Sequence, residues 1–348
     1  MLARVLRIVI AIAMFSIVIG AFIFYNGLNN TAVAPLFHPY DYDVPEDIED
    51  PDALLYVREI ISAPDDISET AYVIGVIDNT HINQSPEINV NRDYVLVSMD
   101  TSDIHRGHLI LVNKEHAFVF PADEQNDLVI IADYMTDNVI LATEETAILS
   151  SSVINPLNDL IDTFVDKTEV DNLVIRSAFR SLEGQRKIWN DTVRRWGRAL
   201  APGWAAEAGF SEHHTGLAID FGLMVDRTVE VFEGVYEHAW IPDNSHNFGF
   251  VLRYPGNKIH ITETNFEPWH YRYVGIPHSI IMHRNRWVLE EYIEKIRSYT
   301  VDTPYLITVN GIDYSIYFST EFELRIPFDV EFNISGNNID GFIVTTWK

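Results

Sequence analysis

Two short segments of this chain carry side chains that could together bind one zinc ion. The first, residues 211–220, places His213 and Asp220 seven positions apart. The second, residues 267–270, places a glutamate three positions before another histidine. Two imidazoles and one carboxylate can bind Zn²⁺ at three corners of a tetrahedron and leave the fourth corner for water. A spare glutamate beside such an ion could serve as the general base of metal-assisted hydrolysis.

Spacing alone leaves two interpretations of these residues open. A His-x6-Asp pair is common by chance, and His213 could be an ordinary core or surface histidine rather than a ligand. Gly216 and Ala218 favour a metal site, because small residues between the candidate ligands would allow the backbone to pack closely there. The adjacent His214 is expected to point away from the site, since neighbouring side chains of an extended segment face opposite sides.

The second segment can contribute to the same site only if the chain bends. Positions three apart on a straight strand face opposite sides, so Glu267 and His270 would diverge there. Pro268 lies between them and is the place where a bend or bulge is expected.

Composition limits the partners and the kind of metal site. The 348 residues carry 24 Lys and Arg against 51 Asp and Glu, a formal net charge of −27, which argues against nucleic acid as a partner. We interpret most of this charge as a solvated surface. The chain has no cysteine, so a metal must rest on His, Asp or Glu, and the absence suits a protein outside the reducing cytosol. No pattern in the sequence indicates a protein partner.

The N-terminus predicts export of the rest of the chain. Arg4 and Arg7 precede an uncharged apolar run at residues 8–25, whose length approaches the ~20 residues of a membrane-spanning helix. Residues 32–34 (Ala-Val-Ala) resemble the cleavage site of a secretory signal, but the proline that follows is expected to hinder cleavage. We therefore favour an uncleaved single-pass anchor in the cell membrane. The far flank, residues 26–51, has no Lys or Arg, so the N-terminus should stay inside and the large domain outside.

Pattern and composition divide the remainder into segments. Residues 26–69 are expected to form an extended tether, 70–104 a β-rich segment without assigned role, 105–299 the catalytic domain, and 300–348 a small β appendage. The strands predicted from short β-rich runs are 71–77, 94–98, 108–112, 116–120, 128–131, 173–176, 248–254 and 269–274. The predicted helices are 153–164, 181–200 and 287–298.

The helix predicted at 181–200 places one further candidate residue. Ser181 is a plausible N-cap, and a buried face is expected from Ile188, Trp189, Val193 and Trp196. Arg180 would then lie at a junction between a strand and this helix. It could be an ordinary surface arginine, or it could bind a carboxylate or stabilise charge on a scissile carbonyl.

These motifs resemble those of the VanY-type zinc D-Ala-D-Ala carboxypeptidases, bacterial cell-wall peptidases related to the VanX dipeptidase and to L,D-carboxypeptidases. The family motif Ser-x-His-x-x-Gly-x-Ala-x-Asp is matched in full at 211–220, and Glu-x-Trp-His-x-Arg at 267–272. A motif usually read Ser-Gly-Tyr-Arg-Ser appears at 177–181 as Ser-Ala-Phe-Arg-Ser, departing at its second and third positions. The resemblance extends over residues 105–295.

The resemblance implies a zinc site and a mechanism. It implies that His213, Asp220 and His270 bind Zn²⁺ and that Glu267 is the catalytic base. The implied reaction removes a terminal D-alanine from a peptidoglycan stem peptide, a substrate that lies outside the membrane. The implied fold is α+β, with helices packed on a small antiparallel sheet that carries the metal.

The resemblance also implies substrate contacts, while specificity stays open. Arg180 would stabilise the oxyanion or position the substrate, and Ser211 and Gln185 would contact the substrate peptide. An L,D-carboxypeptidase or a wall endopeptidase of the same fold is an alternative, because the motifs encode the metal site and not the shape of the subsites. A non-enzymatic wall-binding or sensor protein on this scaffold is a further alternative.

Overall fold

The structure of this protein is a computed structural model that describes residues 88–90, 94–121, 127–142 and 147–348. All of these belong to one compact unit, Asp41–Lys348. The predicted anchor at 8–25, the tether at 26–69 and the strand at 71–77 lie outside the described residues. Among the described helices, none combines the length and the apolar character needed to cross a membrane.

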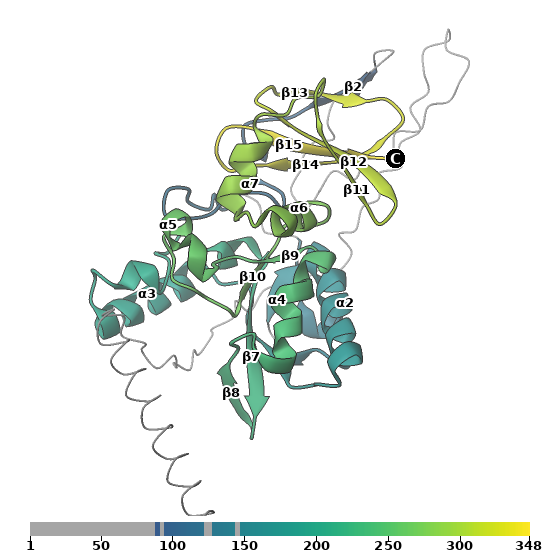
Figure 1. Ribbon diagram of the computed structural model, residues 1–348. Coiled ribbons are helices and arrows are strands. Elements are labelled where there is room, and N and C mark those ends of the chain that lie inside the picture. The colour runs from purple at the N-terminus through teal and green to yellow at the C-terminus, as the bar shows by residue number, and fades with distance from the viewer. Residues whose placement is uncertain (1–87, 91–93, 122–126, 143–146) are drawn as a thin grey trace, which may run out of the picture. The chain divides into compact units, whose positions relative to one another are not determined.

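Helices and sheets are mixed along the chain, as expected for an α+β fold (Figure 1). The described α-helices are α2 (Ser151–Thr168), α3 (Leu182–Trp196), α4 (Trp240–Asn244), α5 (Ile259–Thr262), α6 (His278–Asn285) and α7 (Leu289–Ile296). The largest sheet has the order β4 (Ile140–Leu141), β6 (Leu173–Ser177), β7 (Ala218–Val225), β10 (His270–Tyr273) and β9 (Phe250–Leu252), with β8 (Thr228–Val231) also paired to β7. Its pairs are antiparallel except for β4 with β6, which are parallel. The predicted antiparallel sheet is therefore confirmed apart from this one edge pair.

The helix predicted at 153–164 packs on the largest sheet as α2. Its buried apolar residues recur every three or four positions, which gives one continuous stripe: Val153, Ile154, Leu157, Leu160, Ile161 and Phe164. These side chains share one apolar cluster with Ile175 of β6 and Phe221 of β7. The cluster holds α2 against the strands that carry the candidate site.

The second predicted helix is α3, and its start is fixed as the sequence indicates. The Ser181 hydroxyl accepts a hydrogen bond from the Gly184 backbone N–H at 3.1 Å, which satisfies one of the unpaired donors of the first turn. Ile188 and Trp189 are buried, whereas Val193 and Trp196 are only half-buried. Arg180 lies between β6 and α3, at the junction predicted for it.

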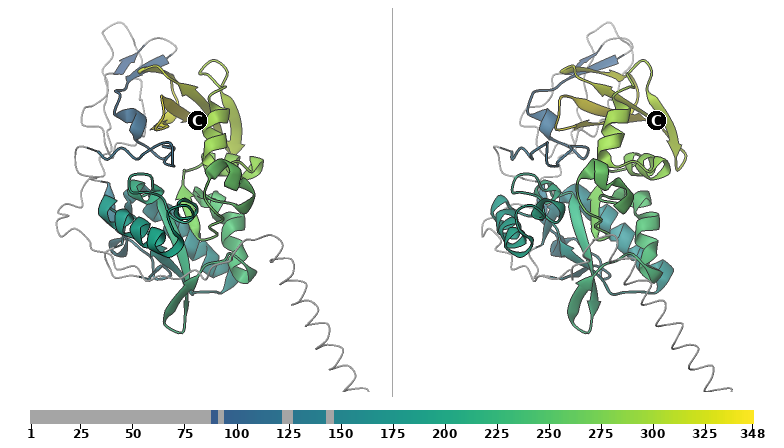
Figure 2. Two further views of the ribbon diagram at one scale, coloured as in Figure 1. Left: turned by 90° about the vertical axis from the view of Figure 1, so that its left-hand side faces the viewer. Right: turned by 60° about the vertical axis from the view of Figure 1, so that its left-hand side comes forward.

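The C-terminal segment forms a four-stranded sheet of β11 (Tyr305–Val309), β12 (Ile312–Ser319), β15 (Phe342–Trp347) and β14 (Glu331–Gly336), in that spatial order. The remaining strand of this region, β13 (Glu323–Pro327), pairs with β2 (Tyr94–Ser98), and β2 pairs with β1 (Ile88–Val90). β2, from the predicted segment 70–104, thus shares a sheet with β13, from the predicted appendage 300–348. Figure 2 shows these blue and yellow strands side by side. A small sheet of β3 (Leu128–Ile130) and β5 (Ile148–Ser150) completes the described strands.

Two strand predictions were wrong, at 108–112 and 116–120. Both segments are irregular, although several of their side chains are buried. Two carbonyl oxygens of 108–112 accept hydrogen bonds from the Arg272 guanidinium, each at 3.0 Å, instead of from a neighbouring strand. In 116–120, the Phe118 N–H donates to the Gly209 carbonyl at 2.7 Å, which is also outside any sheet. Long-range contacts of this kind satisfy the backbone without a ladder.

Candidate active site

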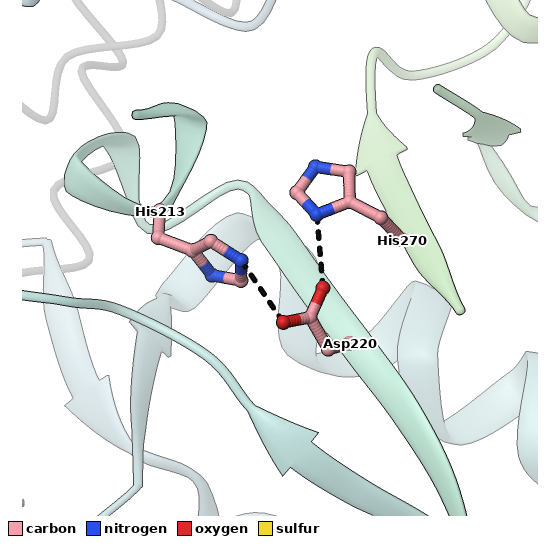
Figure 3. Close-up of side chains that lie close together, drawn as sticks. All are labelled: His213, Asp220 and His270. Atoms are coloured by element: carbon pink, nitrogen blue, oxygen red, sulfur yellow. Dashed lines mark hydrogen bonds and ion pairs between the residues drawn. The ribbon is translucent and has the colours of Figure 1, made fainter. Parts of the chain in front are cut away.

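The pairing of β7 with β10 brings together the three predicted metal ligands. In this antiparallel pair Asp220 lies directly opposite His270. His213 comes from a short 3₁₀ helix, η5 (Glu212–Thr215), that precedes β7. One potential ligand atom from each side chain lies within 4.8 Å of the other two, and all three residues are buried (Figure 3).

The turn that carries His213 is held by small and polar residues. The Ser211 hydroxyl accepts a hydrogen bond from the His213 backbone N–H at 3.4 Å and thereby caps η5. Gly216 ends the turn in the left-handed region at φ +68°. A Cβ atom there would lie 2.6 Å from the Leu128 side chain and 3.0 Å from the Ser150 backbone nitrogen. The close packing predicted from Gly216 is therefore confirmed.

The imidazole of His213 is held neutral with one nitrogen facing the cluster. Its Nδ1 lies 2.6 Å from the Ala178 carbonyl oxygen, which can only accept a hydrogen bond, so Nδ1 carries the proton. Its Nε2 lies 3.3 Å from Oδ2 of Asp220. Burial and the nearby Arg180 lower the pKa of His213 to about 4, against the raising effect of Asp220. Neutral imidazole is the form that binds a metal ion.

Asp220 supplies the negative charge of the cluster and lies beside the His270 ring. Burial raises the pKa of Asp220, but the two histidines lower it more. The pKa of this carboxyl therefore lies well below its usual range, and the group is ionised. Its Oδ1 lies 2.9 Å from Nδ1 of His270. Burial lowers the pKa of His270, but the carboxylates around it raise this pKa to about 9. Surroundings that favour a proton on this ring also favour a metal cation, and the donor set of two imidazoles and one carboxylate fits Zn²⁺.

Glu267 lies beside the three ligands. A turn at Pro268 and Trp269 separates it from β10, so the chain bends where the sequence requires it. Its Oε2 is 4.0 Å from Nδ1 of His270. Burial, as the largest cause, raises the pKa of Glu267 to about 7. A carboxyl group that exchanges its proton near neutral pH is suited to general acid–base catalysis.

The Arg180 guanidinium faces the cluster from the β6–α3 junction. It donates to Oε1 of Gln185 at 2.6 Å and to the Ser177 hydroxyl at 2.8 Å, and lies 3.8 Å from Oδ2 of Asp220. Its Nε is buried and has no hydrogen-bond partner among the described residues. The Gln185 side chain also donates to the Ala206 carbonyl at 2.7 Å, so both ends of its amide are engaged within the protein. This geometry favours a role for Gln185 in holding Arg180.

His214 points away from the metal cluster, as expected. Its Nδ1 lies 2.6 Å from the Arg180 carbonyl oxygen, and its Nε2 accepts a hydrogen bond from the Gly209 N–H at 3.0 Å. It therefore supports the backbone on either side of the site and is not part of the ligand cluster.

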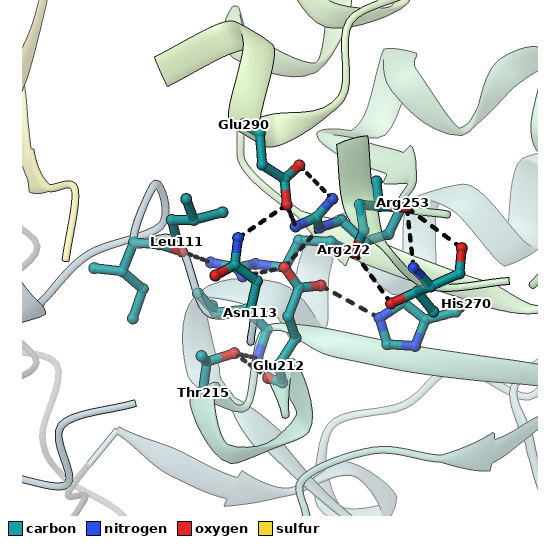
Figure 4. Close-up of polar contacts among 12 residues, drawn as sticks. Leu111, Asn113, Glu212, Thr215, Arg253, His270, Arg272 and Glu290 are labelled. Carbon is teal, nitrogen blue, oxygen red and sulfur yellow. Dashed lines mark hydrogen bonds and ion pairs between the residues drawn. The ribbon is translucent and has the colours of Figure 1, made fainter. Parts of the chain in front are cut away.

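One residue at the site was missed by the sequence reasoning. Glu212, between Ser211 and His213, is buried, and its Oε2 lies 3.3 Å from Nε2 of His270 (Figure 4). Its other oxygen accepts hydrogen bonds from two buried arginines, Arg253 and Arg272. Burial raises the pKa of Glu212, but these arginines lower it more, so the carboxylate is ionised. The signal available in the sequence was an acidic residue directly beside a candidate ligand.

Comparison with known proteins agrees with this geometry. Residues 147–276 match the family model described as "VanY: D-alanyl-D-alanine carboxypeptidase". A D-alanyl-D-alanine carboxypeptidase of Enterococcus faecium is 30% identical over 250 residues, which cover 70% of this chain and 76% of the relative. The putative carboxypeptidase YodJ of Bacillus subtilis is 36% identical over 194 residues, covering 54% and 68%.

A solved structure gives the same result at the level of the fold. The vancomycin-resistance D,D-dipeptidase VanXYg, in complex with a D-Ala-D-Ala phosphinate analog, superposes with a TM-score of 0.61 at 31% identity. The match covers 73% of this chain and 98% of that protein. With the two motifs matched in full and their residues gathered at one point, the chain belongs to the VanY family of D-alanyl-D-alanine carboxypeptidases.

Proposed function

We propose that this protein is a zinc carboxypeptidase that removes the terminal D-alanine from peptidoglycan stem peptides. The observation that carries the proposal is the buried cluster of His213, Asp220 and His270 with Glu267 beside it. The three ligands would hold Zn²⁺. When bound, the ion polarises a carbonyl and lowers the pKa of a water molecule.

Glu267 supplies the proton transfers of the reaction. As a carboxylate it takes a proton from the attacking water, whose oxygen forms the new bond to the scissile carbonyl carbon. It then gives this proton to the amide nitrogen, and the carbon–nitrogen bond breaks to release D-alanine. A group with its pKa near 7 can accept and return a proton with little free-energy cost in either direction.

Arg180 supplies positive charge where the substrate becomes negative. The tetrahedral intermediate carries an oxyanion, and the C-terminal D-alanine of the substrate carries a carboxylate. Either group could accept a hydrogen bond from the unpartnered Nε of Arg180. Gln185 and Ser177 hold the guanidinium in place, which reduces the reorganisation needed during the reaction. Ser211 caps the η5 turn and thereby helps to hold His213 in place.

We also propose the cellular arrangement that the sequence predicts. Residues 8–25 would anchor the chain in the membrane, 26–69 would form the tether, and the catalytic domain of 105–299 would work outside the cell. Support comes from the flanking arginines Arg4 and Arg7 and from a substrate located beyond the membrane. Expression of the full chain in bacteria, followed by membrane fractionation and protease treatment of intact spheroplasts, tests this. Recovery of the catalytic domain from the cytosolic fraction would contradict it.

The reaction is tested with defined stem peptides. The purified protein, with its zinc content measured, is incubated with a pentapeptide ending in D-Ala-D-Ala and with the matching tetrapeptide, and the products are identified by mass. We expect release of one D-alanine from the pentapeptide, loss of this activity with a chelator, and its return with Zn²⁺. Release only from the tetrapeptide would identify an L,D-carboxypeptidase instead. No cleavage of either peptide by the zinc-loaded protein would refute the proposed activity.

A further inference from the structure

The Glu212 carboxylate lies between the candidate metal site and a pair of buried arginines. On one side, its Oε2 is 3.3 Å from Nε2 of His270. On the other, its Oε1 is 2.7 Å from Nε of Arg253 and 3.0 Å from Nη1 of Arg272. None of the Glu212, Arg253 and Arg272 side chains has any exposed surface. Both carboxylate oxygens are thus engaged in a region without solvent.

The two nitrogens of the His270 ring therefore face two different carboxylates. Nδ1 lies 2.9 Å from Asp220, within the metal cluster, and Nε2 faces Glu212 outside it. An ionised carboxylate can only accept hydrogen bonds, and the imidazole that binds a metal ion must be neutral, with one N–H to donate. If Nε2 donates to Glu212, the lone pair of Nδ1 is left free for an ion. Carboxylates often hold metal-binding histidines in this way.

Glu212 is itself held so that it cannot easily turn away. Arg253 binds Glu290 of α7 in a bidentate pair, with distances of 2.9 and 2.7 Å (Figure 4). Arg272 donates its other nitrogen to two backbone carbonyls of the irregular segment 108–112. Two carboxylates thus face two guanidiniums, and each arginine is fixed at both ends. Such paired burial restricts the carboxylate more than a single hydrogen bond would.

We propose that Glu212 is a positioning residue that fixes the orientation of His270 and thereby sets the zinc affinity of the site. It accepts the Nε2–H of His270 and leaves Nδ1 as the metal-binding atom. The inference rests on the zinc site proposed above. Loss of such an outer carboxylate is expected to weaken metal binding by about 10- to 100-fold.

The test compares two variants that each remove one carboxylate from the same arginine pair. Glu212→Gln removes the acceptor that faces His270, whereas Glu290→Gln leaves it intact. Zinc dissociation constants are measured by competition with a chromophoric chelator, and the unfolding free energy of each metal-free variant by denaturation. We expect about 10- to 100-fold weaker zinc binding for Glu212→Gln. The loss for Glu290→Gln should be clearly smaller, because the Glu212 acceptor remains and Arg272 still holds it. Equal losses in both variants, or no loss in Glu212→Gln, would overturn the inference.

Two measurements on the unsubstituted protein separate this inference from the zinc site. A wild-type protein that binds no zinc would overturn both. If it binds zinc but Glu212→Gln does not fold, ¹⁵N NMR of the histidine side chains in the zinc-loaded protein decides the question. We expect metal-bound Nδ1 and protonated Nε2 for His270. Zinc on Nε2, or a deprotonated Nε2, would overturn the role of Glu212 while leaving the proposed activity standing.

Discussion

Replacing Glu267 with glutamine should abolish most of the activity and leave the zinc site intact. Glutamine keeps the size of the side chain but cannot take up a proton from water. A positioned general base contributes about 10²- to 10⁴-fold, so kcat should fall by that factor, equivalent to about 3–5 kcal/mol of activation free energy. Because Glu267 lies outside the cluster of His213, Asp220 and His270, zinc content should remain at one ion per chain.

The assay is D-alanine release from a pentapeptide at saturating substrate, with zinc content and thermal unfolding measured on the same samples. Glu263→Gln is the matched control, because that glutamate belongs to the same segment but is exposed and paired with Lys114. Its kcat should equal that of the wild type. A fall in kcat of less than tenfold for Glu267→Gln, with zinc retained, would refute the assignment of Glu267 as the base. Loss of zinc would show that Glu267 contributes to metal binding instead.

Three further predictions concern charge, packing and pH. Arg180→Lys should lower kcat/KM for the pentapeptide by about 100- to 1,000-fold, because lysine cannot reproduce the hydrogen bonds of the guanidinium; a change below threefold would contradict this. Phe164→Ala should lower the unfolding free energy by about 3–5 kcal/mol in denaturant titrations, because this fully buried ring lies in the core under α2; a loss below 1 kcal/mol would contradict this. Burial lowers the pKa of His278, between Tyr292 and Thr345, to about 3, with a smaller contribution from His108. The unfolded chain therefore binds a proton below about pH 6.5 that the folded chain does not. As the pH falls from about 6.5 toward 3, the wild type should then lose about 1.4 kcal/mol of unfolding free energy per pH unit relative to His278→Gln. A difference between the two proteins that is independent of pH would refute this.

The sequence was sufficient for the elements whose signals are local. The apolar stripe of α2 and the Ser181 cap of α3 depend on neighbouring positions, so periodicity and capping rules predict them. The ligand cluster was predictable because Gly216 and Pro268 mark the two places where the backbone must turn.

Interactions between distant segments were not predictable from local patterns. Arg253 follows β9 and Arg272 lies in β10, and nothing near Glu212 in the sequence specifies these two partners. The apolar run at 108–112 indicated a strand, but two of its carbonyl oxygens accept hydrogen bonds from the Arg272 side chain. An apolar run indicates which side chains are buried and does not indicate which group satisfies the backbone.

The pairing of β2 with β13 has a consequence for biosynthesis. Ser98 of β2 is opposite Glu323 of β13. During synthesis on the ribosome, β2 therefore emerges more than two hundred residues before the strand that it pairs with. The β6, β7, β9 and β10 strands lie between them and can pair before that partner exists. A chain that stops after β10 would contain every proposed catalytic residue yet leave one edge of β2 with unpaired backbone groups. Exposed edges of this kind promote aggregation, so premature termination should give insoluble protein rather than a smaller enzyme.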